Sequence, residues 1–168
     1  MPEGYIPQNE GMFRDVSVNP PLGSILNPRF ARACFARMAQ VQRVIDCIIR
    51  ALAPVIPDRV TAGNAATVMS VSYAGFDAEK AQYWVCVEVN EGSYGARAGK
   101  DGLDTVDNLM ANTRNVPVEE IELHYPLRVE RYEFRDAPPG PGRFRGGAGH
   151  VREVRFLTDG FFSCNGDR

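Results

Sequence analysis

The residues best suited to do chemistry lie between positions 90 and 122 of this 168-residue chain. Four glycines occur here within eleven residues, and charged side chains stand among them: Gly92, Gly95, Arg97, Gly99, Lys100, Asp101 and Gly102. Glycine lets the backbone approach a ligand closely, so backbone amides and charged side chains can surround one small polar group. The loop therefore predicts a binding site, although the same glycines also suit a tight surface connection.

A polar segment follows this loop, from position 108 to position 122. It carries amide, basic and acidic side chains around a single proline, among them Asn112, Asn115 and Glu119. Asparagines can orient an amide or a ketone, and a glutamate can act as a base or hold Arg97 in place. The alternative interpretation is that the glutamates are solvated charges that suit the first turn of a helix.

Two further arginines stand among glycines and prolines near the end of the chain, at positions 143 and 145. Such a pair can hold a carboxylate or a phosphate through bidentate hydrogen bonds, although arginines on exposed strand faces are also common. The resulting hypothesis assigns catalysis to Arg97, Asp101 and Glu119, and substrate binding to Lys100, Asn112, Asn115, Arg143 and Arg145. In it, Arg97 and Lys100 neutralise an oxyanion or a phosphate.

Other kinds of site find little support. The segment ending at Lys100 is not a P-loop, because Tyr94 stands where that motif needs glycine and Asp101 where it needs Ser or Thr. His124 and His150 are far apart and have no ligand at a suitable spacing, so we expect no metal site from this chain alone. The four cysteines form no CxxC pair and are expected to be reduced residues of the core or its boundary.

The overall composition excludes several classes of partner. Hydrophobic residues make up 44% of the chain, as in an ordinary globular domain, and the net charge is -2. This charge gives no general attraction to nucleic acid or to an anionic membrane. No apolar run approaches the roughly 20 residues that cross a bilayer, and the first residues do not resemble an export signal. We therefore expect a cytoplasmic protein.

The elements that position the site follow from hydrophobic periodicity. Residues 1–30, rich in Pro, Gly and Asn, predict an extended arm, and residues 31–168 predict an α+β domain. From Ala31 to about Pro54, apolar residues recur at spacings of three and four, which predicts a long amphipathic core helix. The strands are expected in four runs: a hairpin at 66–73 and 82–89, and half-exposed strands at 127–134 and 151–157.

Between the hairpin and the later strands, a helical turn is expected around 105–111 and a second helix start at Pro117. The predicted fold is α+β, with one long amphipathic helix packed on a mixed or antiparallel sheet and glycine-rich loops at one edge of that sheet.

Five motifs resemble those of the hydantoinase B/oxoprolinase family and occur in the family's order. They are NEGMFRDVSV and PPLGSILNPRF near the start, EGSYGARAGKDGLD in the middle, then ANTRNVPVEEIELHYPLRVERYEFR and PGPGRFRGGAGHVREVRF. The family includes the B-type component of N-methylhydantoinase, the corresponding half of 5-oxoprolinase, caprolactamase-type lactam hydrolases, and the large subunit of acetone and acetophenone carboxylases.

The resemblance implies a small subunit or a fragment of a hydantoinase B-type enzyme complex. One implied reaction is ATP-dependent hydrolysis of a cyclic amide, a hydantoin or a lactam. A second is ATP-dependent carboxylation of a ketone, and a third interpretation is a non-catalytic structural subunit of such a complex. In both reactions ATP would convert an unreactive oxygen into a phosphorylated leaving group.

The resemblance also implies partners. These are a hydantoinase A-type ATP-binding subunit, a polypeptide carrying the upstream part of the hydantoinase B-type subunit, and a small-molecule substrate. In some family members the Asp and His metal ligands lie upstream of the NEGMFRD motif. ATP and a divalent metal ion (Mg, Mn or Zn) are therefore expected to be bound mainly by other chains, and this chain is expected to be inactive alone.

Overall fold

The computed structural model describes residues 9–34, 37–65, 69–90, 92–109, 111 and 113–166. The chain divides into two compact units, Met1–Phe35 and Ala36–Arg168, which are described separately. In the first unit, the 3-10 helix η1 (Glu10–Phe13) starts at Asn9, whose side chain accepts a hydrogen bond from the Gly11 amide at 2.9 Å. Local hydrogen bonds of this kind hold the described part of that unit.

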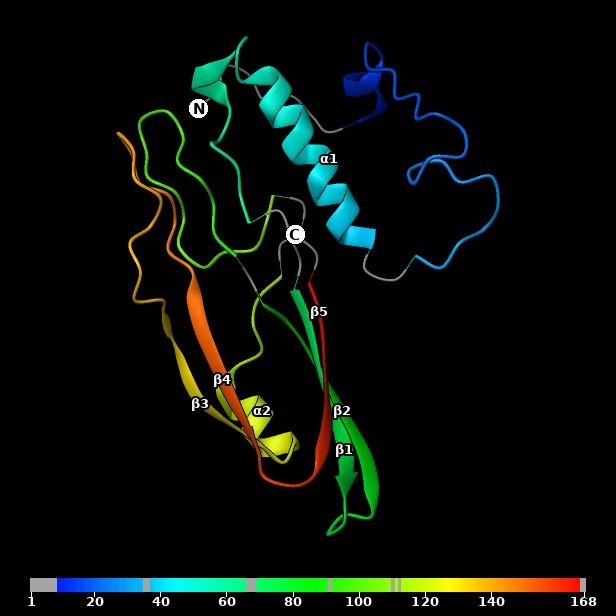
Figure 1. Ribbon diagram of the computed structural model, residues 1–168, viewed down its shortest axis with the longest axis vertical. Coiled ribbons are helices and arrows are strands. Elements are labelled where there is room, and N and C mark those ends of the chain that lie inside the picture. The colour runs from blue at the N-terminus through cyan, green and yellow to red at the C-terminus, as the bar shows by residue number, and fades with distance from the viewer. Residues whose placement is uncertain are drawn as a thin grey trace. The chain divides into compact units, whose positions relative to one another are not determined.

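The second unit begins with helix α1, Arg37–Leu52 (Figure 1). The helix was predicted from Ala31, but residues 31–34 are not helical. Its predicted packing on a sheet is not found, because Ile48 and Leu52 are 53% and 41% exposed and the buried residue of its described part is Gln42. Periodicity shows that one face of a helix is apolar, but it does not show which surface covers that face.

The described strands of the second unit form two antiparallel sheets (Figure 1). In one sheet, β1 (Met69–Asp77) lies between β2 (Gln82–Asn90) and β5 (Gly160–Asn165). In the other, β3 (Leu127–Phe134) pairs with β4 (His150–Phe156). The α+β class is confirmed, and of the two predicted sheet types the described strands form the antiparallel one.

The predicted hairpin is present as β1 and β2, but its first strand continues further than expected. Gly75, in the stretch between the two predicted strands, pairs with Trp84 across the hairpin. A Cβ at Gly75 would lie 2.8 Å from the indole, so glycine lets the ring pack against the strand. The strand ends at Asp77, whose carboxylate accepts hydrogen bonds from the amides of Glu79 and Lys80 at 3.0 and 3.1 Å.

Helix α2 (Val118–His124) begins after Pro117, as predicted, and buries Ile121 completely. The described residues of 105–111 do not form the expected helical turn: Thr105 lies in a bend, Val106 forms an isolated bridge with Gly92, and Leu109 lies in a turn. Strand β5 was not predicted, since its short sequence GFFSCN shows no alternation of apolar and polar residues.

The core lies where the inward side chains of β1 and β2 meet α2 and the second sheet. Its buried members are Val71, Tyr73, Trp84, Cys86, Ile121 and Leu127, with Tyr125, Val129, Val154 and Phe156 packed against them. The glycine-rich loops lie at the opposite end of the strands from α2 (Figure 1). Most of the predicted site residues fall in these loops.

Candidate functional site

The glycine-rich loop is joined edge to edge with two other segments by backbone hydrogen bonds. We call the three segments the loop stack: residues 61–65, 92–106 and 139–149. The amide of Gly95 donates to the carbonyl of Gly63 at 2.6 Å, and the amide of Gly102 donates to that of Arg145 at 2.7 Å. These amides donate hydrogen bonds to neighbouring backbone carbonyls and are not available to a ligand. At these two glycines the loop is therefore a tight backbone connection.

Close packing within the loop stack explains why glycine is needed. A Cβ on Gly102 would lie 2.1 Å from the carbonyl oxygen of Tyr94, and one on Gly147 would lie 1.9 Å from that of Leu103. Backbone atoms on both sides leave no room for a side chain. Gly99 has a φ of 78°, in the left-handed region that favours glycine. The glycines therefore set the shape of the loop on which the charged residues stand.

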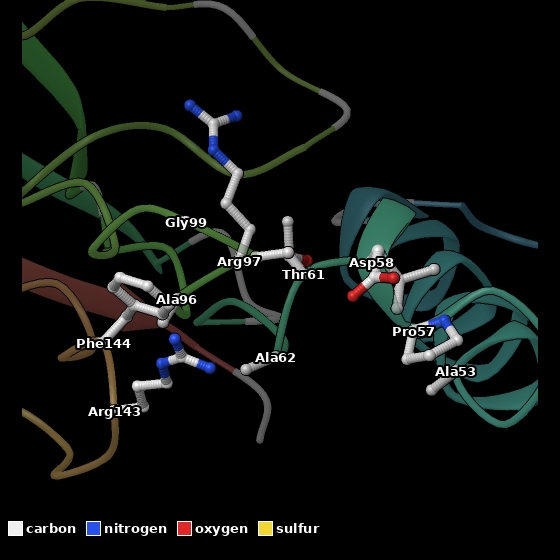
Figure 2. A pocket seen from close by; sticks show the side chains of 12 residues that line it. Ala53, Pro57, Asp58, Thr61, Ala62, Ala96, Arg97, Gly99, Arg143 and Phe144 are labelled. Carbon is white, nitrogen blue, oxygen red and sulfur yellow. The ribbon is translucent and has the colours of Figure 1, made fainter.

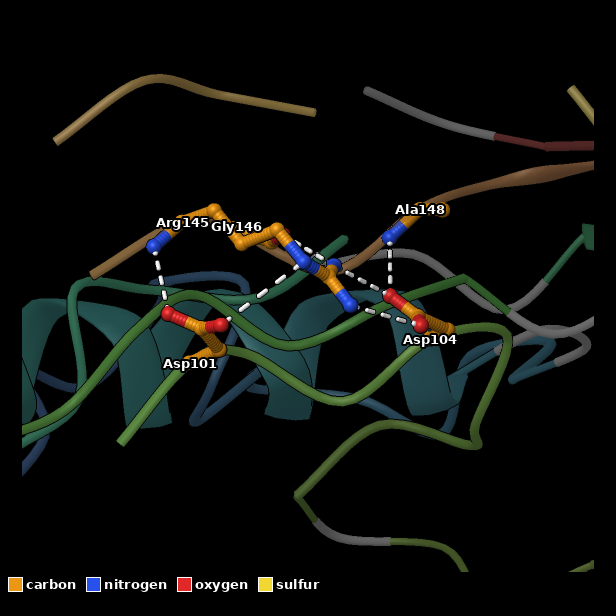
Figure 3. Close-up of polar contacts among 5 residues, drawn as sticks. All are labelled: Asp101, Asp104, Arg145, Gly146 and Ala148. Carbon is orange, nitrogen blue, oxygen red and sulfur yellow. Dashed lines mark hydrogen bonds and ion pairs between the residues drawn. The ribbon is translucent and has the colours of Figure 1, made fainter. Parts of the chain in front are cut away.

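Two of the predicted residues, Asp101 and Arg145, bind each other within the loop stack (Figure 3). The guanidinium of Arg145 also donates to both carboxylate oxygens of Asp104, at 2.7 and 3.0 Å. The Asp104 carboxylate accepts a third hydrogen bond, from the Ala148 amide at 2.6 Å. The bonds from Arg145 and from Ala148 lower the pKa of Asp104 to about 2. Arg145 is thus neutralised by carboxylates of its own chain.

Arg97 and Arg143 line a pocket of about 500 Å³ between the loop stack and the segment that follows α1. Figure 2 shows the two arginines on separate stretches of chain, with their guanidinium groups pointing in different directions. Asp58 lies on another wall, and Arg143 lies over the ring of Phe144 at 5.7 Å. Neither arginine forms an ion pair with a described residue. The pocket therefore presents two guanidinium groups that have no ion-pair partner among the described residues, and such groups suit a carboxylate or a phosphate.

Lys100 and Glu119 do not join this pocket. Lys100 is exposed, and its backbone pairs with that of Arg97 across a tight turn. Glu119 is exposed in the first turn of α2, at the other end of the strands from the loop stack. The predicted contact in which Glu119 holds Arg97 is therefore absent from the described structure.

Asn115 lies in a different pocket, of about 380 Å³, and its side-chain amide donates a hydrogen bond to the hydroxyl of Tyr132 on β3. The other predicted asparagine, Asn112, lies outside the described residues. Tyr132 was not predicted as a site residue, since its position in an alternating strand gives no sign of a functional hydroxyl.

A buried ion pair between the two sheets was also not predicted. Arg152 on β4 donates through Nε and Nη2 to the carboxylate of Glu88 on β2, at 3.2 and 2.6 Å. The two side chains are only 4% and 3% exposed. The sequence does indicate that Glu88 is buried, because alternate residues of a strand point to the same face and Glu88 alternates with Trp84 and Cys86. Burial, and then the Glu88 charge, raise the pKa of the Cys86 thiol to about 11.

The divalent metal that the family resemblance implies has no matching ligand set in the described ranges. Among these residues, no group of three or more His, Cys, Asp or Glu side chains lies close enough together to bind a metal ion. Within the same ranges, no helix combines the length and the apolar character needed to span a bilayer.

The fold and the pocket together define an α+β protein with a cationic pocket beside glycine-rich loops. The whole chain, residues 1–168, matches the Hydantoinase B/oxoprolinase family, and the chain belongs to that family.

Three comparisons illustrate this membership. A protein of Pseudomonas sp. (strain NS671), named as the B-type component of a D-/L-hydantoinase, is 48% identical over 164 residues, which cover 98% of this chain and 27% of that protein. The 5-oxoprolinase PfmaA of Pestalotiopsis fici is 33% identical over 168 residues, or 97% of this chain and 13% of the relative. The nucleotide-free structure of acetone carboxylase has a similar fold, with a TM-score of 0.55 and 21% identity over 67% of this chain and 15% of that one. This chain thus spans about a quarter of the hydantoinase relative and less of the other two.

Proposed function

We propose that this chain is part of a hydantoinase B-type enzyme that hydrolyses a cyclic amide, a hydantoin or a lactam, in an ATP-dependent complex. The family membership supports this proposal, as do relatives named as a hydantoinase component and as 5-oxoprolinase. The complex would include a hydantoinase A-type ATP-binding subunit and a polypeptide that carries the rest of the hydantoinase B-type subunit. In this proposal ATP and a divalent metal ion are bound mainly by those chains, and this cytoplasmic chain is inactive alone.

The main support for a direct role of this chain in the reaction is a difference between its arginines. Arg145 is neutralised by Asp104, whereas Arg97 and Arg143 line a pocket and have no carboxylate partner among the described residues. Hydrolysis of a cyclic amide produces a carboxylate, and ATP supplies a phosphate. Either anion would be stabilised by the two free guanidinium groups. Because these groups point in different directions in Figure 2, a side-chain rotation would be needed for both to hold one ligand.

The test uses this chain assembled with its hydantoinase A-type partner and the polypeptide that completes the hydantoinase B-type subunit. ATP-dependent ring opening of hydantoin and of 5-oxoproline is measured for the wild type, for Arg97→Ala, for Arg143→Ala and for the double variant. Loss of a charge-assisted contact is expected to lower kcat/KM by at least about tenfold for each single variant. Arg128→Ala is the matched control, since Arg128 is exposed on β3 outside the pocket.

Unchanged kcat/KM in the double variant would remove the two arginines from the site. The ketone carboxylase alternative is tested in the same preparation, by incorporation of labelled bicarbonate into acetone or acetophenone. Incorporation without ring opening would replace hydrolysis by carboxylation as the reaction of the complex.

A structural role in the complex is a second candidate for part of the chain. It is favoured by the contacts of Arg145, which binds both Asp101 and Asp104 within the loop stack. Under this candidate, substitutions at Asp101 or Arg145 would weaken assembly and leave the KM of the remaining assembled enzyme unchanged.

A further inference from the structure

The pocket at Asn115 is separate from the pocket that holds Arg97 and Arg143. It has a volume of about 380 Å³ and lies between residues of the stretches 103–107 and 113–115 and Tyr132 of strand β3. Its polar lining includes Asn115, Thr113 and Tyr132, together with the oppositely charged side chains of Arg114 and Asp107, and Leu103 contributes apolar surface. The pocket is therefore large enough for a small ring and offers hydrogen bonds from one side.

Tyr132 is fixed in this wall by contacts on its ring and on its hydroxyl. The guanidinium of Arg152 lies over the ring, 4.6 Å from its centroid, and His150 meets the ring edge to face at 5.4 Å. The hydroxyl is bound by the Asn115 amide. Arg152 is itself held by its two hydrogen bonds to Glu88. A chain of contacts thus runs from the buried ion pair to the amide of Asn115.

The surroundings of Tyr132 contain energetically unfavourable features that close packing does not require. Arg152 Nη1 and His150 Nδ1 are buried without a hydrogen-bond partner among the described atoms. Thr105, another lining residue, has a φ of 39°, which is rare for a β-branched side chain. Unpaired buried polar atoms and strained backbone cluster at binding and catalytic sites. Three such features therefore lie around or behind one pocket.

The side chain of Asn115 determines which ligand fits. A primary amide has two N–H donors and one carbonyl acceptor. One N–H is used by Tyr132, while the carbonyl oxygen and the second N–H have no partner among the described contacts. A ring amide presents an N–H donor beside a C=O acceptor on one edge, because its amide bond is held cis by the ring. That edge is complementary to the free part of Asn115.

We infer that this pocket binds the amide edge of the cyclic substrate, with Asn115 as the hydrogen-bonding residue and with Tyr132 and Arg152 as positioning residues. The inference deepens the proposed function and rests on it for the identity of the substrate as a cyclic amide. It also separates two tasks within one chain. The arginine pocket binds an anion, and the Asn115 pocket recognises the neutral ring.

The experiment compares the binding of three neutral probes to the assembled complex in the absence of ATP. The probes are 2-pyrrolidinone, its N-methyl derivative, which lacks the N–H, and cyclopentanone, which lacks the amide. Binding is followed by saturation-transfer NMR with competition. We expect 2-pyrrolidinone to bind severalfold to about tenfold more tightly than either analogue, because each analogue loses a hydrogen bond with the half-buried Asn115 amide, and one hydrogen bond contributes about 0.5–1.5 kcal/mol.

Variants connect that preference to the named residues. Asn115→Leu is expected to abolish the preference for 2-pyrrolidinone, and Tyr132→Phe, which keeps the ring over Arg152, is expected to reduce it severalfold. The matched control is Tyr83→Phe, since Tyr83 is 84% exposed on β2. Equal binding of all three probes by the wild type, or an unchanged preference in Asn115→Leu, would overturn the inference.

The outcomes also separate this inference from the proposed function. A complex that opens cyclic amides with an unchanged KM in Asn115→Leu would retain the function and remove the pocket from it. A complex that opens no cyclic amide, yet loses its preference for 2-pyrrolidinone in Asn115→Leu, would retain the pocket and remove the function.

Discussion

The guanidinium of Arg152 and the carboxylate of Glu88 form a two-bond ion pair in the interior, with side chains that are 4% and 3% exposed. The pair joins β4 of one sheet to β2 of the other. A buried ion pair is not strong evidence of stability in itself, because both charges must leave water. However, removing either partner leaves the other charge buried and unpaired, so the loss of one partner alone is strongly destabilising.

We predict that Glu88→Gln or Arg152→Met alone lowers the free energy of unfolding by about 3–5 kcal/mol, because each leaves an uncompensated buried group. The double variant is expected to lose less than the sum of the two. Urea denaturation of all four proteins in a double-mutant cycle measures both effects.

The matched control for this prediction is the exposed pair formed by Arg155 and Glu130, joined at 2.8 Å. Arg155→Gln is expected to change stability by less than about 1 kcal/mol. Equal losses from Arg155→Gln and Arg152→Met would contradict the special role given to burial.

The loop stack provides a second prediction. Gly102→Ala would place a Cβ 2.1 Å from the Tyr94 carbonyl oxygen, where backbone must move. We expect a loss of about 1–3 kcal/mol or more, as for other overpacked sites. Gly149→Ala is the control, because nothing lies within 4 Å of its added Cβ. Thermal unfolding of both variants gives the comparison, and a Gly149→Ala variant that melts as low as Gly102→Ala would refute the packing argument.

The Asp104–Arg145 pair predicts a dependence of stability on pH. Hydrogen bonds from Arg145 and from the Ala148 amide lower the pKa of Asp104 to about 2, below its usual value of about 4. The unfolded chain therefore binds the proton more readily, so stability falls as pH falls from about 4 to about 2. Asp104→Asn and Arg145→Gln should each reduce this acid dependence, which acid titrations of stability would measure. A wild-type slope that survives in both variants would exclude the pair as its source.

Cysteine labelling provides a fourth prediction. Burial, followed by the charge of Glu88, raises the pKa of Cys86 to about 11, whereas Cys47 and Cys164 are exposed. Because the thiolate is the reactive form, Cys86 should react with iodoacetamide at pH 8 only after unfolding. Peptide mapping by mass spectrometry distinguishes the sites. Rapid modification of Cys86 in the folded chain would show that the core between the sheets opens readily.

The sequence allowed four of the five described strands to be predicted, because each carries a run of suitable residues bounded by turn signals. It also indicated the start of α2 at Pro117. Helix α1 was predicted as a helix, but its predicted packing on a sheet is not found, since the periodic pattern identifies an apolar face and leaves its neighbour unspecified. The strand β5 lacked any periodic signal.

The site was harder to predict because it depends on which loops lie side by side. Arg145 binds Asp104, which lies 41 residues away, and this pairing follows from backbone hydrogen bonds in the loop stack. No local pattern distinguishes it from Arg143, which stays free in the pocket. By contrast, the alternation of residues along β2 shows that Glu88 points to the same side as the buried Trp84 and Cys86. This alternation is the clearest indication of the buried ion pair that the sequence contains.

The central position of β1 has a consequence for how the protein folds. One neighbour, β2, follows it directly as a hairpin, whereas the other, β5, comes from the far end of the described chain. Local hairpins close in microseconds, but pairing between distant segments is slow because a long loop must close first. During synthesis, therefore, β1 and β2 are made before β5, and one edge of β1 stays unpaired until β5 has been synthesised. In that interval the exposed edge can pair with a strand of another molecule.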